Sequence, residues 1–284
     1  MELSWFVFSL SATILLGIGM ALYKVPSFKK ESRFVTTFWV MVIPFILSLI
    51  FFNQYLGLSS IGMIIIALLW GISFSLLVTL QMYALKKIDT NALFPVTSTL
   101  SLVVAIILGF LLFKEIISLP QFFGIVLVII LVYFYLYKKK KLQYSKEFLF
   151  AGLGIIFFSV LNKIIQKIIA NNYDIHAYQI FQYFWAVIFS FLIILYFHKK
   201  DFKKYFSKTS FLSGGLIGLF SFFGGYALLT ALTKGPFTLI MAIHSIYIFV
   251  TALTGALLFK EKLSKKIILL LILAILALII IRIG

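Results

Sequence analysis

The sequence is dominated by unbroken apolar runs separated by short charged or turn-rich breaks. Each run is close to the ~20 residues that a helix needs to cross a hydrocarbon core of ~30 Å. The runs are continuous Ile, Leu and Phe, not the alternating segments of ~10 residues that are typical of a transmembrane barrel. Only 12% of the residues are charged, against about 25% in soluble domains, so a water-soluble fold is excluded.

The runs predict an all-α membrane protein with little mass outside the bilayer. The first run starts at Met1-Glu2 without a basic flank, so it is expected to be a retained helix and not a signal peptide. The ten predicted transmembrane helices are residues 3–23, 34–52, 61–85, 91–113, 119–137, 148–170, 177–197, 211–233, 236–259 and 266–283.

The basic residues are distributed unevenly among the predicted loops. Of 25 Lys and Arg, 20 fall in the odd-numbered loops, counted from the N-terminus. The positive-inside rule then predicts a multi-pass protein of the cell membrane with cytoplasmic odd-numbered loops and both termini outside. The net charge of +17 is thus mainly an orientation signal and a contact with anionic lipid headgroups of the bilayer, and nucleic acid is not expected as a partner.

An internal repeat divides the chain into residues 1–143 and 144–284. Each half contains five predicted helices. Because an odd number of crossings ends on the opposite side of the membrane, the second half must enter the membrane from that side. The prediction is therefore two inverted five-helix repeats (5+5), an arrangement typical of secondary transporters, with the substrate between the repeats. The matching segments are Phe113–Glu115 with Phe259–Glu261 and Phe38-Trp39 with Phe184-Trp185, at a shift of 146, and Tyr83–Leu85 with Tyr226–Leu228, at a shift of 143.

Each half contains Tyr-Ala-Leu, a helix with polar residues, Leu-Phe-Lys-Glu, a Ser and a purely apolar helix. This order resembles the EamA domain of the drug/metabolite transporter superfamily. The resemblance implies a central cavity, with the helices predicted at 119–137 and 266–283 at the periphery. Two departures stand out. Lys114 and Lys260 replace a usual Gly, and the frequent mid-helix Pro is replaced by residues near Leu102 and Ile248.

Polar residues gather in the helices predicted at 91–113 and 236–259. His244, Tyr247 and Thr251 share one face of the second helix, and the 146-residue shift pairs His244 with Ser98 and Tyr247 with Ser101. A polar face in a membrane helix must meet protein or water. The face either lines a substrate site or forms hydrogen bonds between helices.

The helix predicted at 148–170 carries a polar stripe that includes Asn162, Lys163, Gln166 and Lys167. Lys167 is near the helix end, where its side chain is expected to reach the interface. Lys163 lies about one further turn inside, ~10 Å from the end at 1.5 Å per residue. An ammonium group at that depth favours a wet cavity or an anionic ligand, and we hypothesise that Lys163 binds a carboxylate or phosphate.

A small polar metabolite, such as an amino acid, a sugar or a related solute, suits such a hydroxyl- and amide-rich lining. No cofactor and no metal are expected, because the chain has no Cys, three scattered His and eight acids outside the predicted helices. The candidate substrate-binding residues are Lys163, Asn162, Gln166, His244, Tyr247, Thr251, Ser98, Ser101, Gln182 and Tyr83.

A secondary transporter is thus the leading hypothesis, and no catalytic residue is predicted. Two alternatives stay open: a membrane enzyme or flippase for lipid-linked substrates, and a non-transporting membrane subunit. Proton-coupled antiport commonly uses a carboxylate inside the membrane, and the predicted helices contain no acid. Facilitated diffusion or exchange is therefore favoured over such antiport. The sequence also leaves a homodimer open.

Overall fold

The computed structural model describes residues 2–29, 31–85, 90–136, 146–197, 206–260 and 265–284, and within these ranges it contains no strand. The helices are α1 (Glu2–Leu22), α2 (Lys24–Phe28), α3 (Arg33–Phe52), the 3-10 helix η1 (Asn53–Leu58), α4 (Ile61–Leu85), α5 (Thr90–Phe113), α6 (Leu119–Leu136), α7 (Lys146–Asn172), α8 (Ile175–Phe197), α9 (Lys208–Lys234), α10 (Phe237–Ser245), α11 (Tyr247–Phe259) and α12 (Lys265–Ile283).

Eight helical segments of the described chain are long and apolar enough to cross a membrane. Apolar helices of this length form because the bilayer core offers no water to the backbone, so each N–H and C=O must be paired within the helix. Two further apolar helices, α5 and α6, contribute the shorter stretches Leu100–Phe113 and Leu119–Phe134. The helical positions agree with the predicted runs within a few residues.

The span predicted at 236–259 is confirmed as Phe237–Phe259. Its helix is interrupted at Ile246, which separates α10 from α11. Around the break the backbone uses tighter i to i−3 bonds: the N–H of Ile246 donates to the carbonyl of Ile243 (3.1 Å), and the N–H of Phe249 donates to that of Ile246 (2.9 Å). No proline causes this interruption.

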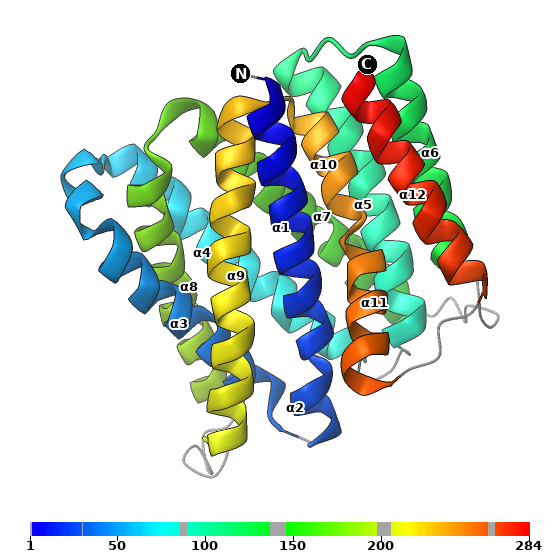
Figure 1. The fold of residues 1–284 in the computed structure, drawn as a ribbon. Helices are drawn as coiled ribbons and strands as arrows, with labels where there is room; N and C mark the ends of the chain where they lie inside the picture. The colour runs from blue at the N-terminus through cyan, green and yellow to red at the C-terminus, as the bar shows by residue number, and fades with distance from the viewer. Residues whose placement is uncertain (1, 30, 86–89, 137–145, 198–205, 261–264) are drawn as a thin grey trace.

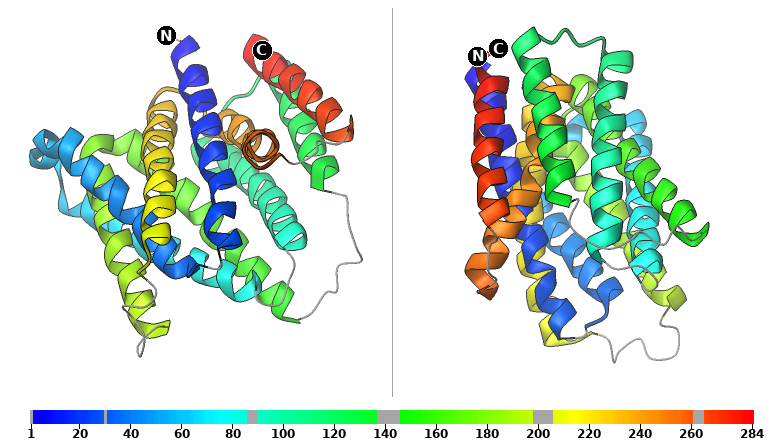
Figure 2. Two further views of the ribbon diagram at one scale, coloured as in Figure 1. Left: turned by 60° about the horizontal axis from the view of Figure 1, so that its bottom comes forward. Right: turned by 90° about the vertical axis from the view of Figure 1, so that its right-hand side faces the viewer.

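The helices form one bundle in which both chain ends lie at the same end (Figure 1). The last helices of the two halves, α6 and α12, lie side by side at one edge, as all views show (Figures 1 and 2). Gly124 of α6 permits this contact, because a Cβ there would stand 2.6 Å from the Ile281 side chain. The other face of α12 is exposed along its length, at residues Ile268, Leu269, Ile272, Ile275, Leu276, Ile279 and Ile283.

The packing between helices follows a reciprocal pattern across the two halves. Helix α3 packs against α9, and α8 packs against α4; likewise α1 packs against α9, and α7 against α4. The buried apolar side chains form two clusters. One joins α1, α5, α6, α9, α10, α11 and α12, and the other joins α1, α3, α4, α7, α8 and α9.

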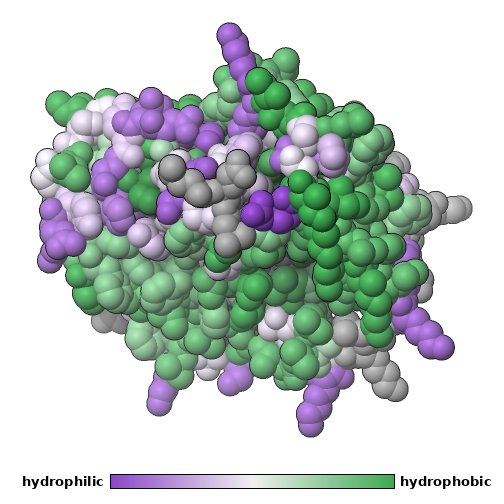
Figure 3. Space-filling model, turned by 45° about the horizontal axis from the view of Figure 1, so that its top comes forward, coloured by the Kyte–Doolittle hydropathy of each residue, from purple (hydrophilic) through white to green (hydrophobic). Residues whose placement is uncertain are grey.

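The surface is divided between an apolar side and polar ends. In Figure 3, hydrophilic residues gather on the end of the bundle that carries the termini, and long hydrophilic side chains project at the opposite end. Hydrophobic residues cover the side between them. A belt of this kind is what a bilayer requires of a multi-pass protein.

Candidate functional site

Helix α7 carries the first part of the candidate site. Asn162 is only 7% exposed, and neither its Oδ1 nor its Nδ2 has a hydrogen-bond partner. Lys163 and Gln166, which lie beside it, are half-buried. Among the described residues, Lys163 has no hydrogen-bond or ion-pair partner. An amide buried without partners costs roughly 1–3 kcal/mol, so Asn162 is a position where a ligand would be stabilised.

The interruption between α10 and α11 carries the second part. The ring of His244 stacks on that of Tyr247 across the break, with centroids 5.3 Å apart and planes at 24°. The Nδ1 of His244 is buried and has no hydrogen-bond partner. The break between α10 and α11 therefore adds a second buried polar group without a partner to the interior of the bundle, besides Asn162 of α7.

Helix α1 supports this broken segment from the other side. The Thr13 hydroxyl donates to the carbonyl of Ser9 (2.8 Å). It also donates, at the longer distance of 3.4 Å, to the carbonyl of Ile243, just before the break. Gly17 lets α11 come close, because a Cβ there would stand 2.7 Å from that of Val250. Thr251 donates to the Gly17 carbonyl (3.0 Å), so this predicted site residue forms a hydrogen bond between helices.

The remaining predicted site residues are spread over three helices. Gln182 of α8 is 1% exposed, and its Oε1 has no partner; Ser101 of α5 is 3% exposed. The backbone of Ser98 lies in α5 and that of Tyr83 in α4, but their side chains lie outside what the structure describes.

Lys167 differs from the prediction that it reaches the membrane interface. Its side chain is 7% exposed, and its Nζ donates to the carbonyls of Leu232 (2.8 Å) and Gly235 (3.0 Å). These carbonyls lie at the C-terminal end of α9, where a positive charge is favoured by the helix dipole. Lys167 therefore holds the α9 end in place, one turn from Lys163.

Glu115 completes the same turn between α9 and α10. Its carboxylate accepts hydrogen bonds from the backbone N–H groups of Phe237 and of Thr238, the latter at 2.8 Å. A carboxylate at a helix N-terminus is stabilised by the unpaired N–H groups and the dipole. Glu115, which lies between α5 and α6, therefore caps the start of α10.

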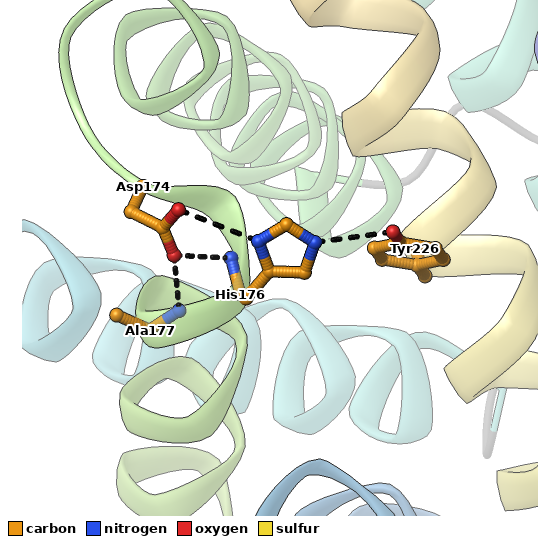
Figure 4. A network of polar contacts seen from close by, with 4 residues as sticks. All are labelled: Asp174, His176, Ala177 and Tyr226. Atoms are coloured by element: carbon orange, nitrogen blue, oxygen red, sulfur yellow. Dashed lines mark hydrogen bonds and ion pairs between the residues drawn. The ribbon is translucent and has the colours of Figure 1, made fainter. Parts of the chain in front are cut away.

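A second polar cluster, at the end of the bundle where α8 begins, was missed by the sequence analysis (Figure 4). The Asp174 carboxylate accepts from the N–H groups of His176 (3.0 Å) and Ala177 (2.8 Å) and lies 3.3 Å from the His176 Nδ1. The Nε2 of His176 is 3.1 Å from the Tyr226 hydroxyl of α9. The spacing of Asp174 and His176, together with the repeated Tyr226, is the signal that was available.

Aromatic rings from the first half of the chain enclose this histidine. The His176 ring stacks on Tyr55 of η1, with centroids 4.3 Å apart and planes at 17°, and meets Phe52 edge-on at 5.0 Å. The cluster therefore joins α3 and η1 to α8 and α9 at this end of the bundle.

A bundle of apolar, membrane-length helices with unpartnered polar groups in its interior defines a multi-pass membrane protein with an internal polar site. Residues 146–283 match the EamA-like transporter family. The match covers the second predicted repeat and confirms the resemblance to the EamA domain of the drug/metabolite transporter superfamily.

A separate comparison with solved structures concerns the fold of the whole chain. One crystal structure of a protein superposes with a TM-score of 0.79 at 12% sequence identity, over 99% of this chain and 96% of that chain. At this identity the similarity concerns the fold alone. No curated protein matches the sequence.

Proposed function

We propose that the chain is a secondary transporter that moves a small polar metabolite across the cell membrane by alternating access. The observation that carries the proposal is the broken helix α10–α11, where the buried Nδ1 of His244 has no partner, together with the half-buried Lys163 and the unpartnered Asn162 of α7. Interrupted helices with polar groups at the break are the usual substrate sites of secondary transporters. The EamA family is a transporter family, which agrees with this assignment.

The proposed architecture is ten spanning helices in two inverted repeats, residues 1–143 and 144–284. Reciprocal contacts support it. Trp39 packs on Gly214 in the α3–α9 pair, and Trp185 packs on Gly71 in the α8–α4 pair. These residues are related by the sequence shifts of 146 and 143. Rocking of one repeat against the other would then expose a site between them to each side in turn.

The transported solute is proposed to carry a carboxylate or phosphate that binds Lys163. An ammonium inside a membrane bundle costs about 2.5 to 3.5 kcal/mol at the centre of the bilayer, and an anionic ligand offsets this cost. Asn162 adds donor and acceptor atoms for the rest of a polar solute, and the ring pair of His244 and Tyr247 adds an apolar face. The family alone does not define this substrate class.

The test is thermal unfolding of the purified protein against a panel of amino acids, sugars and their phosphates, followed by uptake of the stabilising solute into proteoliposomes. A bound ligand raises the unfolding temperature by mass action. Lys163→Gln is expected to remove both the stabilisation and the uptake. The matched control Lys234→Gln changes an exposed lysine at the end of α9 and should retain both. Unchanged uptake by Lys163→Gln would overturn the proposed role of Lys163.

The proposed orientation places the odd-numbered loops in the cytoplasm. Helix α2, which starts at Lys24, and the start of α9 at Lys208 lie at the end of the bundle opposite the termini, which supports one-sided charge (Figure 1). Protease protection of tags at the two termini in intact cells tests the orientation, because external tags are cleaved and cytoplasmic tags are not.

A further inference from the structure

A cavity of about 230 Å³ lies at the end of the bundle opposite the termini, where α1 ends, α2 turns and α9 begins. Its wall is mixed in polarity. Leu22, Leu212 and Leu216 are apolar, and Lys29, Thr209 and Ser213 are polar. The volume is below the ~300–1,000 Å³ of sites that enclose a drug-sized ligand, so it suits a portion of a larger amphipathic molecule.

The cavity faces outward from the bundle. Leu212 and Leu216 are 56% and 46% exposed, so the wall that α9 contributes is open to the outside. Gly214 and Gly218, on another face of the same helix, pack against α3 around Trp39 and Pro44. The cavity is therefore separate from the polar region around Lys163 and opens toward the lipid.

The charges around the cavity favour an anion. Residues 24–33 and 198–208, which flank it in the sequence, contain nine Lys and Arg but only Glu31 and Asp201 as acids. The Glu31 carboxylate is already occupied, because it accepts hydrogen bonds from the hydroxyls of Ser207 (2.7 Å) and Ser210 (2.8 Å). Lys29 is exposed, so its ammonium is accessible at the mouth.

We propose that this cavity binds an anionic glycerophospholipid. One acyl chain lies along Leu22, Leu212 and Leu216, and the phosphate contacts the Lys29 ammonium and the Thr209 hydroxyl. The Ser213 hydroxyl donates to the Thr209 carbonyl (2.7 Å), so Ser213 contributes packing and an acceptor atom only. Basic pockets between helices at the cytoplasmic surface are the usual sites for anionic headgroups. The lipid is not the transported solute, and the site does not depend on the proposed transport.

The test uses the purified full-length protein in detergent with added dioleoyl phosphatidylglycerol or dioleoyl phosphatidylcholine. Phosphatidylglycerol is expected to raise the unfolding temperature in a saturable manner, and phosphatidylcholine is not. A lysine near a headgroup contributes about a fivefold factor in affinity, so Lys29→Gln should weaken the apparent affinity for phosphatidylglycerol about fivefold. Lys265→Gln, which changes an exposed lysine at the same end, is the control and should leave it unchanged.

The acyl-chain part of the proposal is tested separately. Leu216→Trp fills the cavity and should abolish the phosphatidylglycerol effect, whereas Leu269→Trp on the exposed face of α12 should retain it. Glycerol 3-phosphate, which has no acyl chain, should have no effect. The proposal is overturned if both lipids stabilise equally, if Lys265→Gln loses as much affinity as Lys29→Gln, or if glycerol 3-phosphate reproduces the effect.

Discussion

Trp185 of α8 lies directly against Gly71 of α4, so close that a Cβ on Gly71 would stand 2.7 Å from the Cβ of Trp185. The repeat-related pair makes the same contact: a Cβ on Gly214 of α9 would stand 2.6 Å from the Cβ of Trp39 on α3. One tryptophan–glycine contact thus occurs twice, at corresponding places in the two halves. In the absence of a hydrophobic driving force in lipid, close approach at small residues is what holds membrane helices together.

Gly214→Ala is expected to destabilise the protein by roughly 1–3 kcal/mol, because the added methyl group overpacks the α3–α9 contact. Gly71→Ala should cost a similar amount at α4–α8. Gly215→Ala is the matched control, since the nearest atom to its added Cβ is 3.6 Å away and alanine favours the helix. Thermal or denaturant unfolding in detergent measures the differences. Equal behaviour of Gly214→Ala and Gly215→Ala would contradict the packing account.

Lys167→Met is expected to lower the free energy of unfolding by about 2 kcal/mol. The carbonyls of Leu232 and Gly235 would lose the ammonium group that donates hydrogen bonds to them. Lys163→Met, one turn away, removes an ammonium that has no partner in the described chain, so it should not lower the free energy of unfolding and is expected to raise it. The same unfolding measurement compares them. A loss of equal size in both variants would contradict the division between a structural and a ligand-binding lysine.

Lys114→Gly is expected to stabilise the protein by about 1 kcal/mol, because Lys114 has a left-handed backbone with φ of 50° that glycine adopts without a steric cost. The same reasoning applies to Lys260, with φ of 55° at the end of α11. Lys114→Ala removes the charge but keeps the Cβ, so it should give no gain. Stabilisation by alanine equal to that by glycine would assign the effect to charge instead of backbone conformation.

Asp174→Ala is expected to cost about 1 kcal/mol, because it removes the carboxylate that caps the start of α8. Asp174→Ser retains a capping oxygen but not the charge beside His176, so it should recover most of that loss. Tyr226→Phe removes only the hydroxyl contact with His176 and should cost about 1 kcal/mol. Unfolding experiments on the three variants separate the cap from the cross-helix contact; an equal loss in Asp174→Ala and Asp174→Ser would contradict the capping role.

The helix positions were predictable from the sequence because the apolar runs have the length that a bilayer imposes. Lys114 and Lys260, which the 146-residue shift pairs, share a left-handed backbone that glycine adopts without a steric cost. The interruption at Ile246 was not predicted, since no proline or glycine marks it. The residues of α1 that contact the segments around it, Thr13 and Gly17, are far away in the sequence.

The polar residues of the site could be selected from the sequence, but their roles could not. Lys163 and Lys167 look alike on a helical wheel, and only the carbonyls at the end of α9 distinguish them. Thr251 likewise donates to the carbonyl of Gly17. Partners of this kind come from backbone atoms of other helices, which leave no trace in the residue pattern. His176 was missed for the same reason, because Tyr226 and Tyr55 reach it from distant segments.

Alternating access is tested most directly by thiol labelling of Asn162→Cys in the chain, which has no natural cysteine. A membrane-impermeant maleimide is applied to right-side-out and to inside-out vesicles, and Leu269→Cys on the lipid-exposed face of α12 is the control that neither side should label. The account predicts that Asn162→Cys is labelled from both sides. Labelling from one side only, or from neither, would contradict a site that is exposed alternately across the membrane.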